Sequence, residues 1–223
     1  MPAYSIRDRR RKRKRTPFVR VMIAFLSDIH SNTESLGQVL AHAREQGVRR
    51  YMCLGDVIGY GPEPRETLAT IMEVCEFSLL GNHEHGAMYY ASDFNPKARA
   101  AIEWTKDQLN DRSKPRDETF GFWNYLSEMP ESKVVDEMLL VHGSPKDPIR
   151  DYTLPSWQLG DRKAIVNIGS VGQPRDGDPR ASYVTYEQSS GDVRFHRVEY
   201  DVEATMAKIR ASELPDYLAD RLA

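Results

Sequence analysis

The sequence has very little cysteine, and it has no long apolar run. Cys53 and Cys75 are its only cysteines, and both lie in apolar stretches without the spacing of a metal-binding pair. We therefore expect two reduced thiols in the core of a cytoplasmic protein, and no disulfide framework or thiolate metal site. No stretch reaches the roughly 18 apolar residues of a membrane span. A secretory signal is not expected either, because only a short apolar segment, 19–26, follows the basic start.

The chain also lacks a strong net charge. Its 223 residues carry a formal charge of −2, with 40% hydrophobic and 29% charged residues. This composition is ordinary for a globular protein and excludes a molecule that attracts nucleic acid or membranes by its overall charge. The length suits one domain with a sizeable core, while two full domains would be cramped.

The amino-terminal segment departs from this balance. Residues 7–15 read RDRRRKRKR and are all basic except Asp8. Such a block repels itself, so we expect residues 1–20 to form a disordered tail. It can bind RNA or DNA phosphates without sequence preference. Two plainer interpretations stay open: a solvated tail, or an upstream start codon included in error, since Met22 directly begins a predicted strand.

The pattern of apolar residues predicts an α/β fold. The first half alternates strands and helices, which favours parallel strands with helical crossovers. The second half is mostly strands and favours a second, more antiparallel sheet, so we expect a single domain of two packed mixed sheets flanked by helices over residues 21–200. Residues 201–223 are expected to be helical and to pack on it. The predicted strands are 21–28, 50–56, 77–83, 137–143, 163–170, 181–187 and 193–200; the predicted helices are 33–46, 64–74, 96–110, 201–210 and 215–221; loops are predicted at 111–120 and 144–159.

Polar side chains follow four of the predicted strands. The carboxyl ends of parallel strands share one edge of a sheet, so these residues should converge on one crevice. Carboxylate, amide oxygen and imidazole are ligands for Mn, Fe, Zn or Mg, and a carboxylate can bridge two ions that activate a water for attack on phosphorus. A histidine outside the ligand set can supply a proton to the leaving group. The residues concerned are Asp28, His30, Asp56, Asn82, His83 and His142.

These segments together resemble the calcineurin-like metallophosphoesterase superfamily, in its small bacterial and archaeal phosphodiesterase-like branch. The resemblance runs from about residue 21 to 200, through SDIHSN (27–32), GDVIGYGPEP (55–64), GNHE (81–84), VHGSP (141–145) and VNIGSVGQPRDGDPRASY (166–183). It implies a double β-sandwich flanked by helices and a site for two divalent metal ions, with manganese favoured. It further implies that Asp28 and His30 bind the first metal, that Asp56 bridges, that Asn82 and His142 bind the second, and that His83 is the proton donor.

One motif of that family is missing. The family carries a Gly-His-x-His turn between the VHG and NxGS segments, with one histidine for each metal, but residues 144–166 contain no histidine. Either a strand-bearing segment has been lost, or Asp147, Asp151, Asp161, water or substrate replaces the two imidazoles. We expect weak metal binding and activity that needs added Mn²⁺. Of the other histidines, His42 falls in a predicted helix, His196 in a late strand, and His85 two residues beyond His83.

Two further residues have open roles. Arg175 either clamps a phosphate oxygen or pairs with Asp176 or Asp178 in its turn. Asn32 either contacts substrate or caps the helix that follows it. The sequence therefore predicts a metal-dependent phosphoesterase that hydrolyses a phosphomonoester or phosphodiester through metal-activated water. The alternative is a catalytically degenerate member with a binding or regulatory role.

Overall fold

The computed structural model describes residues 21–92, 94–144, 147, 149 and 165–223. The basic segment 7–15 and the candidate ligands Asp151 and Asp161 lie outside these residues. In the described part of the chain, every helix is too short or too polar to span a bilayer.

The main sheet has four strands in the order β2-β1-β5-β6. β1 (Met22–Leu26) runs parallel to β2 (Arg50–Cys53), and helix α1 (Thr33–Glu45) connects the two strands. β5 (Ala181–Glu187) pairs antiparallel with the other edge of β1 and forms a hairpin with β6 (Asp192–Val198). The predicted parallel pair and the late hairpin are both present.

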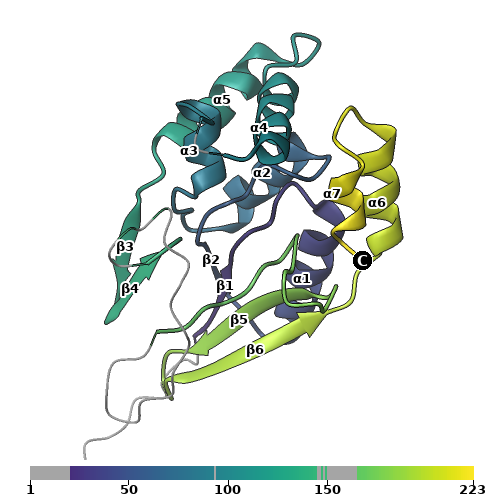
Figure 1. The fold of residues 1–223 in the computed structure, drawn as a ribbon. Coiled ribbons are helices and arrows are strands. Elements are labelled where there is room, and N and C mark those ends of the chain that lie inside the picture. Colours follow the sequence, from purple (N-terminus) through teal and green to yellow (C-terminus); the bar gives the residue numbers. More distant parts are fainter. Residues whose placement is uncertain (1–20, 93, 145–146, 148, 150–164) are drawn as a thin grey trace, which may run out of the picture.

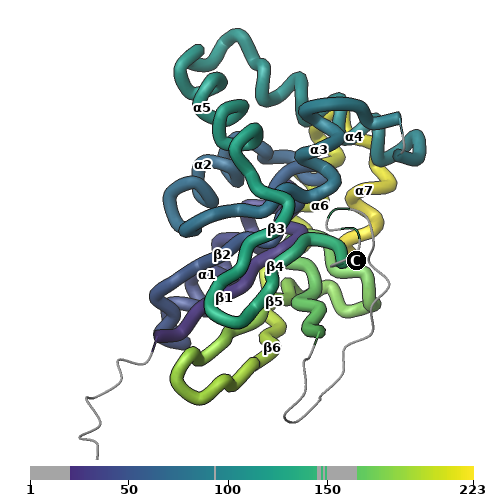
Figure 2. Tube along the Cα trace, turned by 90° about the vertical axis from the view of Figure 1, so that its left-hand side faces the viewer, coloured from purple at the N-terminus to yellow at the C-terminus, as the bar shows by residue number. Residues whose placement is uncertain are grey.

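The second sheet is a hairpin of β3 (Ser132–Val135) and β4 (Met138–Val141). It packs on one face of the main sheet, because Leu140 joins a buried cluster with Ile23, Phe25 and Val184. Figures 1 and 2 show this hairpin beside β1 from two directions. The predicted class, an α/β domain of two mixed sheets flanked by helices, is confirmed. The division of strands differs, since β5 and β6 extend the first sheet.

The opposite face of the main sheet packs against helices. Side chains alternate along a strand, so Ala24 and Leu26 point away from the hairpin and cluster with Leu36 and Val39 of α1. In Figures 1 and 2, α3 (Asn82–Met88), α4 (Pro96–Leu109) and α5 (Arg116–Ser127) lie beyond the carboxyl ends of β1 and β2. The remaining helices are α2 (Pro64–Val74), α6 (Val202–Ala211) and α7 (Tyr217–Asp220).

The carboxyl-terminal helices close one side of the domain. Met206 of α6 and Leu218 of α7 share a buried cluster with Ala101 of α4, and Tyr60 packs against the same cluster. The end of the chain therefore lies next to a residue of the GYG turn, close to the predicted metal ligands.

Three local predictions were wrong. For 77–83, the structure has only a single parallel bridge between Cys53 and Ser78, and the chain enters α3 at Asn82. The predicted strand 163–170 shows no strand over its described residues, 165–170. The predicted loop 111–120 becomes helical at Arg116, where α5 begins, because Phe122 and Leu126 lie four residues apart and are both buried. The charged first turn of that helix concealed this spacing.

The buried face of α2 allows a direct test of the core. Ile71 has no exposed surface, while its neighbour Met72 is 39% exposed. Ile71→Ala leaves a cavity and should lower the free energy of unfolding by about 2–5 kcal/mol, measured by urea denaturation. Met72→Ala should change it by no more than about 0.5 kcal/mol. Equal losses in the two variants would contradict this orientation of α2.

Candidate metal centre

The loops that follow β1 and β2 run side by side as an extension of the parallel pair. Asp28 N donates to Gly55 O at 3.0 Å, and His30 N donates to Asp56 O at 3.0 Å. Asp28, His30 and Asp56 all have positive φ angles, 53°, 51° and 53°. Each such angle costs a non-glycine residue roughly 1–3 kcal/mol and persists only where the surroundings enforce it. Three predicted ligands thus carry this strain, and Ser31, Tyr60 and Asp136 also have positive φ angles.

Gly55 permits the close approach of the third loop. Its φ is +104°, and a Cβ at this position would lie 2.8 Å from Gly81 N. A side chain would therefore push apart the loops that carry Asp56 and Asn82. The glycine of the GD motif is needed for space as well as for its backbone conformation.

Asp56 is the centre of the cluster, and its side chain is buried. Its Oδ2 lies 3.5 Å from His142 Nε2, 3.8 Å from His30 Nε2 and 4.0 Å from His83 Nε2. Asp28 Oδ1 lies 3.5 Å from His30 Nε2. Two groups could each hold a metal ion, with all ligand atoms of a group within 4.8 Å of one another: His30, Asp56 and His83, and Asp28, Asp56 and His142. Asp56 belongs to both, as a bridging ligand must.

The imidazole rings are oriented by backbone carbonyls. His142 Nδ1 lies 2.9 Å from Leu54 O, and His30 Nδ1 lies 3.2 Å from Ile58 O. A carbonyl only accepts, so each Nδ1 carries the proton, and in the neutral ring Nε2 holds the lone pair. Both Nε2 atoms point toward Asp56. This is the arrangement by which proteins orient histidine ligands.

Asn82 completes the predicted set from the start of α3. Its Oδ1 lies 3.2 Å from His142 Nε2. His83, the next residue, is buried, and neither of its ring nitrogens has a hydrogen-bond partner; His30 Nε2 also lacks one. Unpartnered nitrogens buried beside carboxylates fit a divalent metal, because such polar atoms are costly unless something binds them. The structure thus brings all six predicted residues together.

The ionisable side chains of the cluster shift one another's pKa values. Burial opposes ionisation of Asp56, but His142 and His83 hold the pKa of this carboxyl well below its usual range. Burial alone would lower the pKa of His142, yet Asp56 raises it to about 10. Burial lowers the pKa of His83 to about 3. In the cluster, the buried carboxylate of Asp56 is therefore paired with protonated His142. A bound metal ion would supply the same positive charge.

Glu84 is a functional residue that sequence reasoning missed. Its buried carboxylate accepts hydrogen bonds from Asp56 N at 2.8 Å, Gly81 N at 3.0 Å and Ile58 N at 3.1 Å. It thereby ties the Asp56 loop to the start of α3. Burial, followed by the nearby charge of Asp56, raises the pKa of Glu84 to about 7. A signal was available, because an acid three residues after Gly81 has the spacing of a capping box.

The late segment 170–175 also reaches this edge. Val171 N donates to Ser27 O and Gly172 N to Asp28 O, both at 2.9 Å. These bonds place Arg175 at the hollow that Asp28 and Asp56 line. Neither predicted pairing of Arg175 is found in the described residues. Instead, Asp176 pairs with Arg197 and Asp178 with Arg180.

Asn32 caps α1, which is one of the two roles predicted for it from the sequence. Its Oδ1 accepts from Ser35 N at 3.0 Å, and its Nδ2 donates to Gly172 O at 2.9 Å. Its side chain is buried and does not line the large hollow. Asn32 thus links two site loops.

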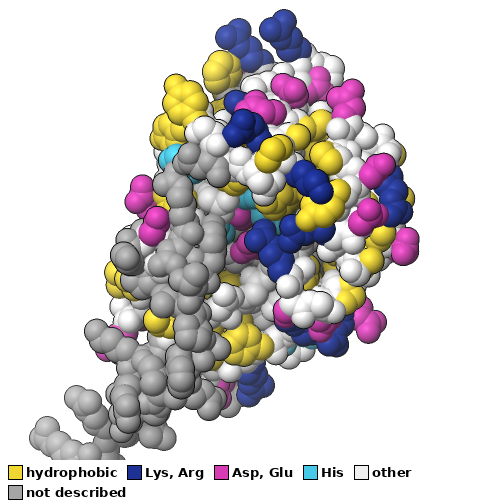
Figure 3. Space-filling view, viewed as in Figure 1, with side chains coloured by type: hydrophobic (Ala, Val, Ile, Leu, Met, Phe, Trp, Pro, Cys, Tyr) yellow, Lys and Arg dark blue, Asp and Glu magenta, His cyan; other side chains and the backbone are white. Residues whose placement is uncertain are grey.

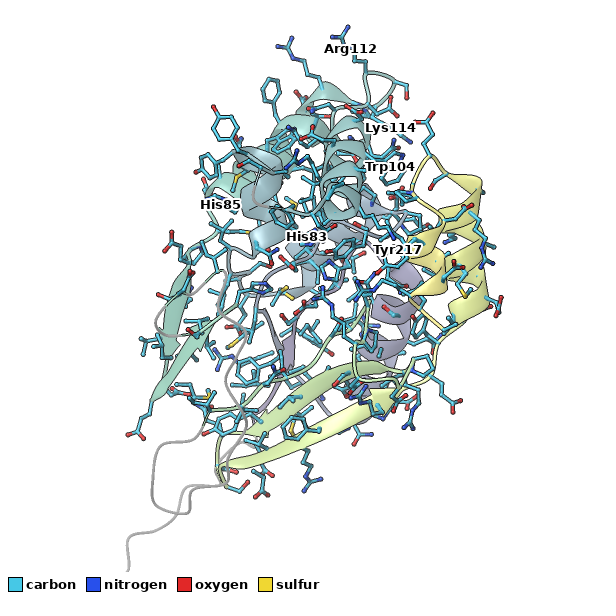
Figure 4. The ribbon with its side chains drawn as sticks, in the orientation of Figure 1. His83, His85, Trp104, Arg112, Lys114 and Tyr217 are labelled. Atoms are coloured by element: carbon cyan, nitrogen blue, oxygen red, sulfur yellow. The ribbon has the colours of Figure 1, made fainter. Side chains whose placement is uncertain are left out.

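The other histidines lie elsewhere. Figure 4 shows His85 on the outer side of α3, turned away from His83, and its ring lies 4.8 Å from that of Tyr89. His42 lies within hydrogen-bond distance of the Tyr183 hydroxyl, and the ring of His196 stacks on the ring of Tyr183. Asp147 belongs to neither candidate metal group. None of these described residues replaces the missing imidazoles.

A hollow of about 1420 Å³ opens over the cluster. Metal-site residues line one end, with Tyr60, Phe94 and Arg175 beside them. Apolar side chains of the main sheet, including Phe25, Val184 and Tyr186, line the rest. In Figure 3, histidine and acidic side chains are visible in this hollow, with Lys and Arg side chains beside them. The site is open to a substrate larger than a single phosphate.

Comparison with known proteins gives consistent matches. A family model described as calcineurin-like phosphoesterase matches residues 21–187. An uncharacterized protein of Methanocaldococcus jannaschii is 32% identical over 244 residues, covering 92% of this chain and 98% of its own. The crystal structure of a metallophosphoesterase from Sphaerobacter thermophilus is similar, with 31% identity, a TM-score of 0.75, and coverage of 91% and 98%. A hypothetical protein from Pyrococcus horikoshii shares the fold, with 19% identity, a TM-score of 0.74, and coverage of 91% and 97%.

Glu84 can be tested separately from the metal ligands. Glu84→Gln places an amide NH₂ against backbone N–H donors, which should lower the free energy of unfolding by about 1–3 kcal/mol. Because the Asp56 loop loses its anchor, the variant should also retain less Mn²⁺ after dialysis, as measured by elemental analysis. The matched control is Glu118→Gln, at an exposed partner of Arg65. Metal content equal to that of the control would contradict an anchoring role.

Proposed function

The chain belongs to the calcineurin-like phosphoesterase family, and we propose that it hydrolyses a phosphomonoester or phosphodiester with water activated by two divalent metal ions. The observation that carries this proposal is the pair of three-residue groups that share the buried Asp56. The match to a calcineurin-like phosphoesterase family and the presence of His/Asp groups able to hold a metal support the same function.

The residues divide into two ligand sets in this proposal. From the resemblance, Asp28, His30 and Asp56 would hold the first ion, and Asp56, Asn82 and His142 would hold the second. The geometric groups share Asp56 but place Asp28 with His142 and His30 with His83. When bound, the ions supply a nucleophilic hydroxide at neutral pH and stabilise the charge on the phosphoryl oxygens. The oxygen and imidazole donors suit Mn²⁺, which we favour over Fe, Zn or Mg. Arg175 lines the same hollow without a carboxylate partner among the described residues and is suited to hold a phosphate oxygen.

His83 has two candidate roles. As proton donor it would protonate the leaving group, and its position beside Asp56 with both nitrogens unpartnered suits this role. The rings of Tyr60 and Phe94, at 4.3 and 5.4 Å, restrict its movement. A second observation favours a ligand role: His83 groups with His30 and Asp56 around one candidate ion position. In that role it would stand in for a histidine that the chain lacks.

We propose that the missing Gly-His-x-His motif was lost and was not replaced by aspartates. The alignment with the archaeal relative is 244 residues long, longer than this whole chain of 223, so that relative has residues without a counterpart here. Asp147, the one described replacement candidate, lies in neither metal group. A degenerate member with a binding or regulatory role therefore remains the alternative. Nucleic-acid contact through residues 7–15 and a cytoplasmic location also stay predictions.

Activity is tested on activated aryl esters. The purified chain should hydrolyse p-nitrophenyl phosphate or its bis-ester when Mn²⁺ is added, and chelator should stop the reaction. Asp56→Asn removes the shared ligand and should lower kcat/KM by more than about 100-fold, since loss of an outer-shell partner already costs about 10–100-fold. Asp178→Asn, at an exposed ion pair, is the control. A chain that binds metal but turns over neither ester would favour the degenerate alternative.

His83→Asn separates the two roles of this residue. A proton donor contributes about 10²–10⁴-fold to turnover, so kcat should fall by that range while metal content, measured by elemental analysis, stays unchanged. The loss should be smaller for an ester whose leaving group needs no proton, such as p-nitrophenyl phosphate, than for an alkyl ester. If metal content falls together with kcat on both esters, His83 is a ligand and the proton-donor assignment is wrong.

A further inference from the structure

Two basic side chains from distant parts of the sequence meet on one tyrosine at the edge of the site. Lys97, in the first turn of α4, places its Nζ 3.6 Å from the centroid of the Tyr217 ring. Arg221, just after α7, donates from Nη1 to the Tyr217 hydroxyl at 3.3 Å, and its Cζ lies 5.8 Å from the same centroid. Tyr217 therefore holds two cations near each other. Its ring face attracts both Lys97 and Arg221, and its hydroxyl also accepts a hydrogen bond from Arg221.

Neighbours of this pair in the chain line the cavities at the metal centre. Asn95 and Ala98, on either side of Lys97 in the chain, line the large hollow together with Asp28 and Asp56. On the other side, Leu222 follows Arg221 and lines a small cavity with Tyr60 and His30. The Tyr60 ring in turn lies 4.7 Å from the His30 ring.

Tyr60 connects Arg175 to the cation pair. Arg175 and Tyr60 both line the large hollow, and Tyr60 also lines the small cavity with Leu222, the residue after Arg221. We call Lys97, Arg175 and Arg221 the basic rim.

The carboxylates closest in sequence to Arg175 and Arg221 pair with other cations. Asp176 pairs with Arg197, Asp178 with Arg180, and Asp220 with Arg210. Within the described residues, none of the three rim side chains forms an ion pair with a carboxylate. Many exposed cations lack such a pair, but these three gather around Tyr60 and Tyr217. Like charges held together without carboxylates create a positive potential that attracts anions.

We propose that the basic rim is an anion subsite for a second phosphate group of the substrate, so that the preferred substrates are phosphate esters with two or more linked phosphates. The inference rests on the proposed function for the scissile phosphate, which lies at the metal centre next to Arg175. Lys97 and Arg221 then bind the following phosphate, Arg221 through its planar guanidinium and Lys97 as a point charge. A simple monoester leaves these two residues without a ligand.

The rim is tested first by direct binding. Inorganic tripolyphosphate and inorganic phosphate are titrated into the metal-free full chain in chelator, and binding is measured by calorimetry. Tripolyphosphate should bind more tightly, and Lys97→Gln or Arg221→Gln should weaken its binding roughly 10- to 100-fold, the range for loss of a charged hydrogen bond. Neither change should alter binding of phosphate by more than about twofold. Lys106→Gln, at a cation on the same helix that pairs with Glu103, is the control.

A second variant guards against misfolding at the chain end. Tyr217→Phe removes the hydroxyl that holds Arg221 but keeps the ring, and it should weaken tripolyphosphate binding by a smaller factor than Arg221→Gln. Thermal melting checks that each variant is folded.

The kinetic counterpart uses Mn²⁺ and p-nitrophenyl phosphate. The two glutamine variants should keep wild-type kcat/KM for this monoester while their inhibition by tripolyphosphate weakens. The proposal is overturned if tripolyphosphate binds no more tightly than phosphate, or if folded variants bind it as the wild type does. If the chain hydrolyses no ester yet binds tripolyphosphate through Lys97 and Arg221, the proposed function fails and the rim stands.

Discussion

The structure of the site depends on the buried carboxylate of Asp56. A carboxylate in the interior is costly unless charged or polar groups surround it, and here three imidazoles do so within 4.0 Å. His83 N also donates to Asp56 Oδ1 at 2.9 Å, which fixes the orientation of the carboxylate. Because Asp56 belongs to both candidate metal groups, any shift of its loop would disturb both at once. The loop pairing, the backbone conformations and the Glu84 hydrogen bonds around it all fix the position of this side chain.

Two of these features belong to the backbone. The parallel pairing of β1 with β2 brings Asp28 and Asp56 to one edge, and hydrogen bonds between the loops continue that pairing past the last strand residues. Left-handed conformations at Asp28, His30 and Asp56 then turn their side chains into the cluster. Glu84 supplies the third restraint from α3. Strain in one segment is thus offset by bonds from two others, which is how preorganised sites are maintained.

The sequence was sufficient to predict which residues at strand ends lie close together in the structure. Asp28, His30, Asp56, Asn82 and His142 each occur in a short motif after an apolar run, and the chain geometry that unites them is common to parallel sheets. The boundary of α2, at Pro64, was also predictable, since proline favours the first turn of a helix.

Other features depended on contacts between distant segments. Glu84 has the local spacing of a capping box after Gly81, but nothing local shows that it also accepts from Asp56 N and Ile58 N. The pairing of Arg175 could not be decided, because the partner of Asp176 is Arg197, 21 residues away on β6. Tyr217 joins Lys97 and Arg221 across more than half of the chain. Such contacts follow from packing, which local periodicity does not encode.

The proposed loss of one strand-bearing segment would account for three otherwise separate observations. The second sheet has only β3 and β4 over the described residues, although an added strand beside β4 would complete a sandwich layer. Apolar side chains remain exposed around that position, Leu139 at 52% and Val166 at 42%. The candidate metal groups contain three residues each, where the resembled family uses a further histidine for each metal. Replacement of the histidines by aspartates would explain only the third observation. It would remove no strand from the second sheet and would uncover no apolar side chain. The proposed deletion would explain all three, since a segment that carried the Gly-His-x-His turn could also supply a strand beside β4.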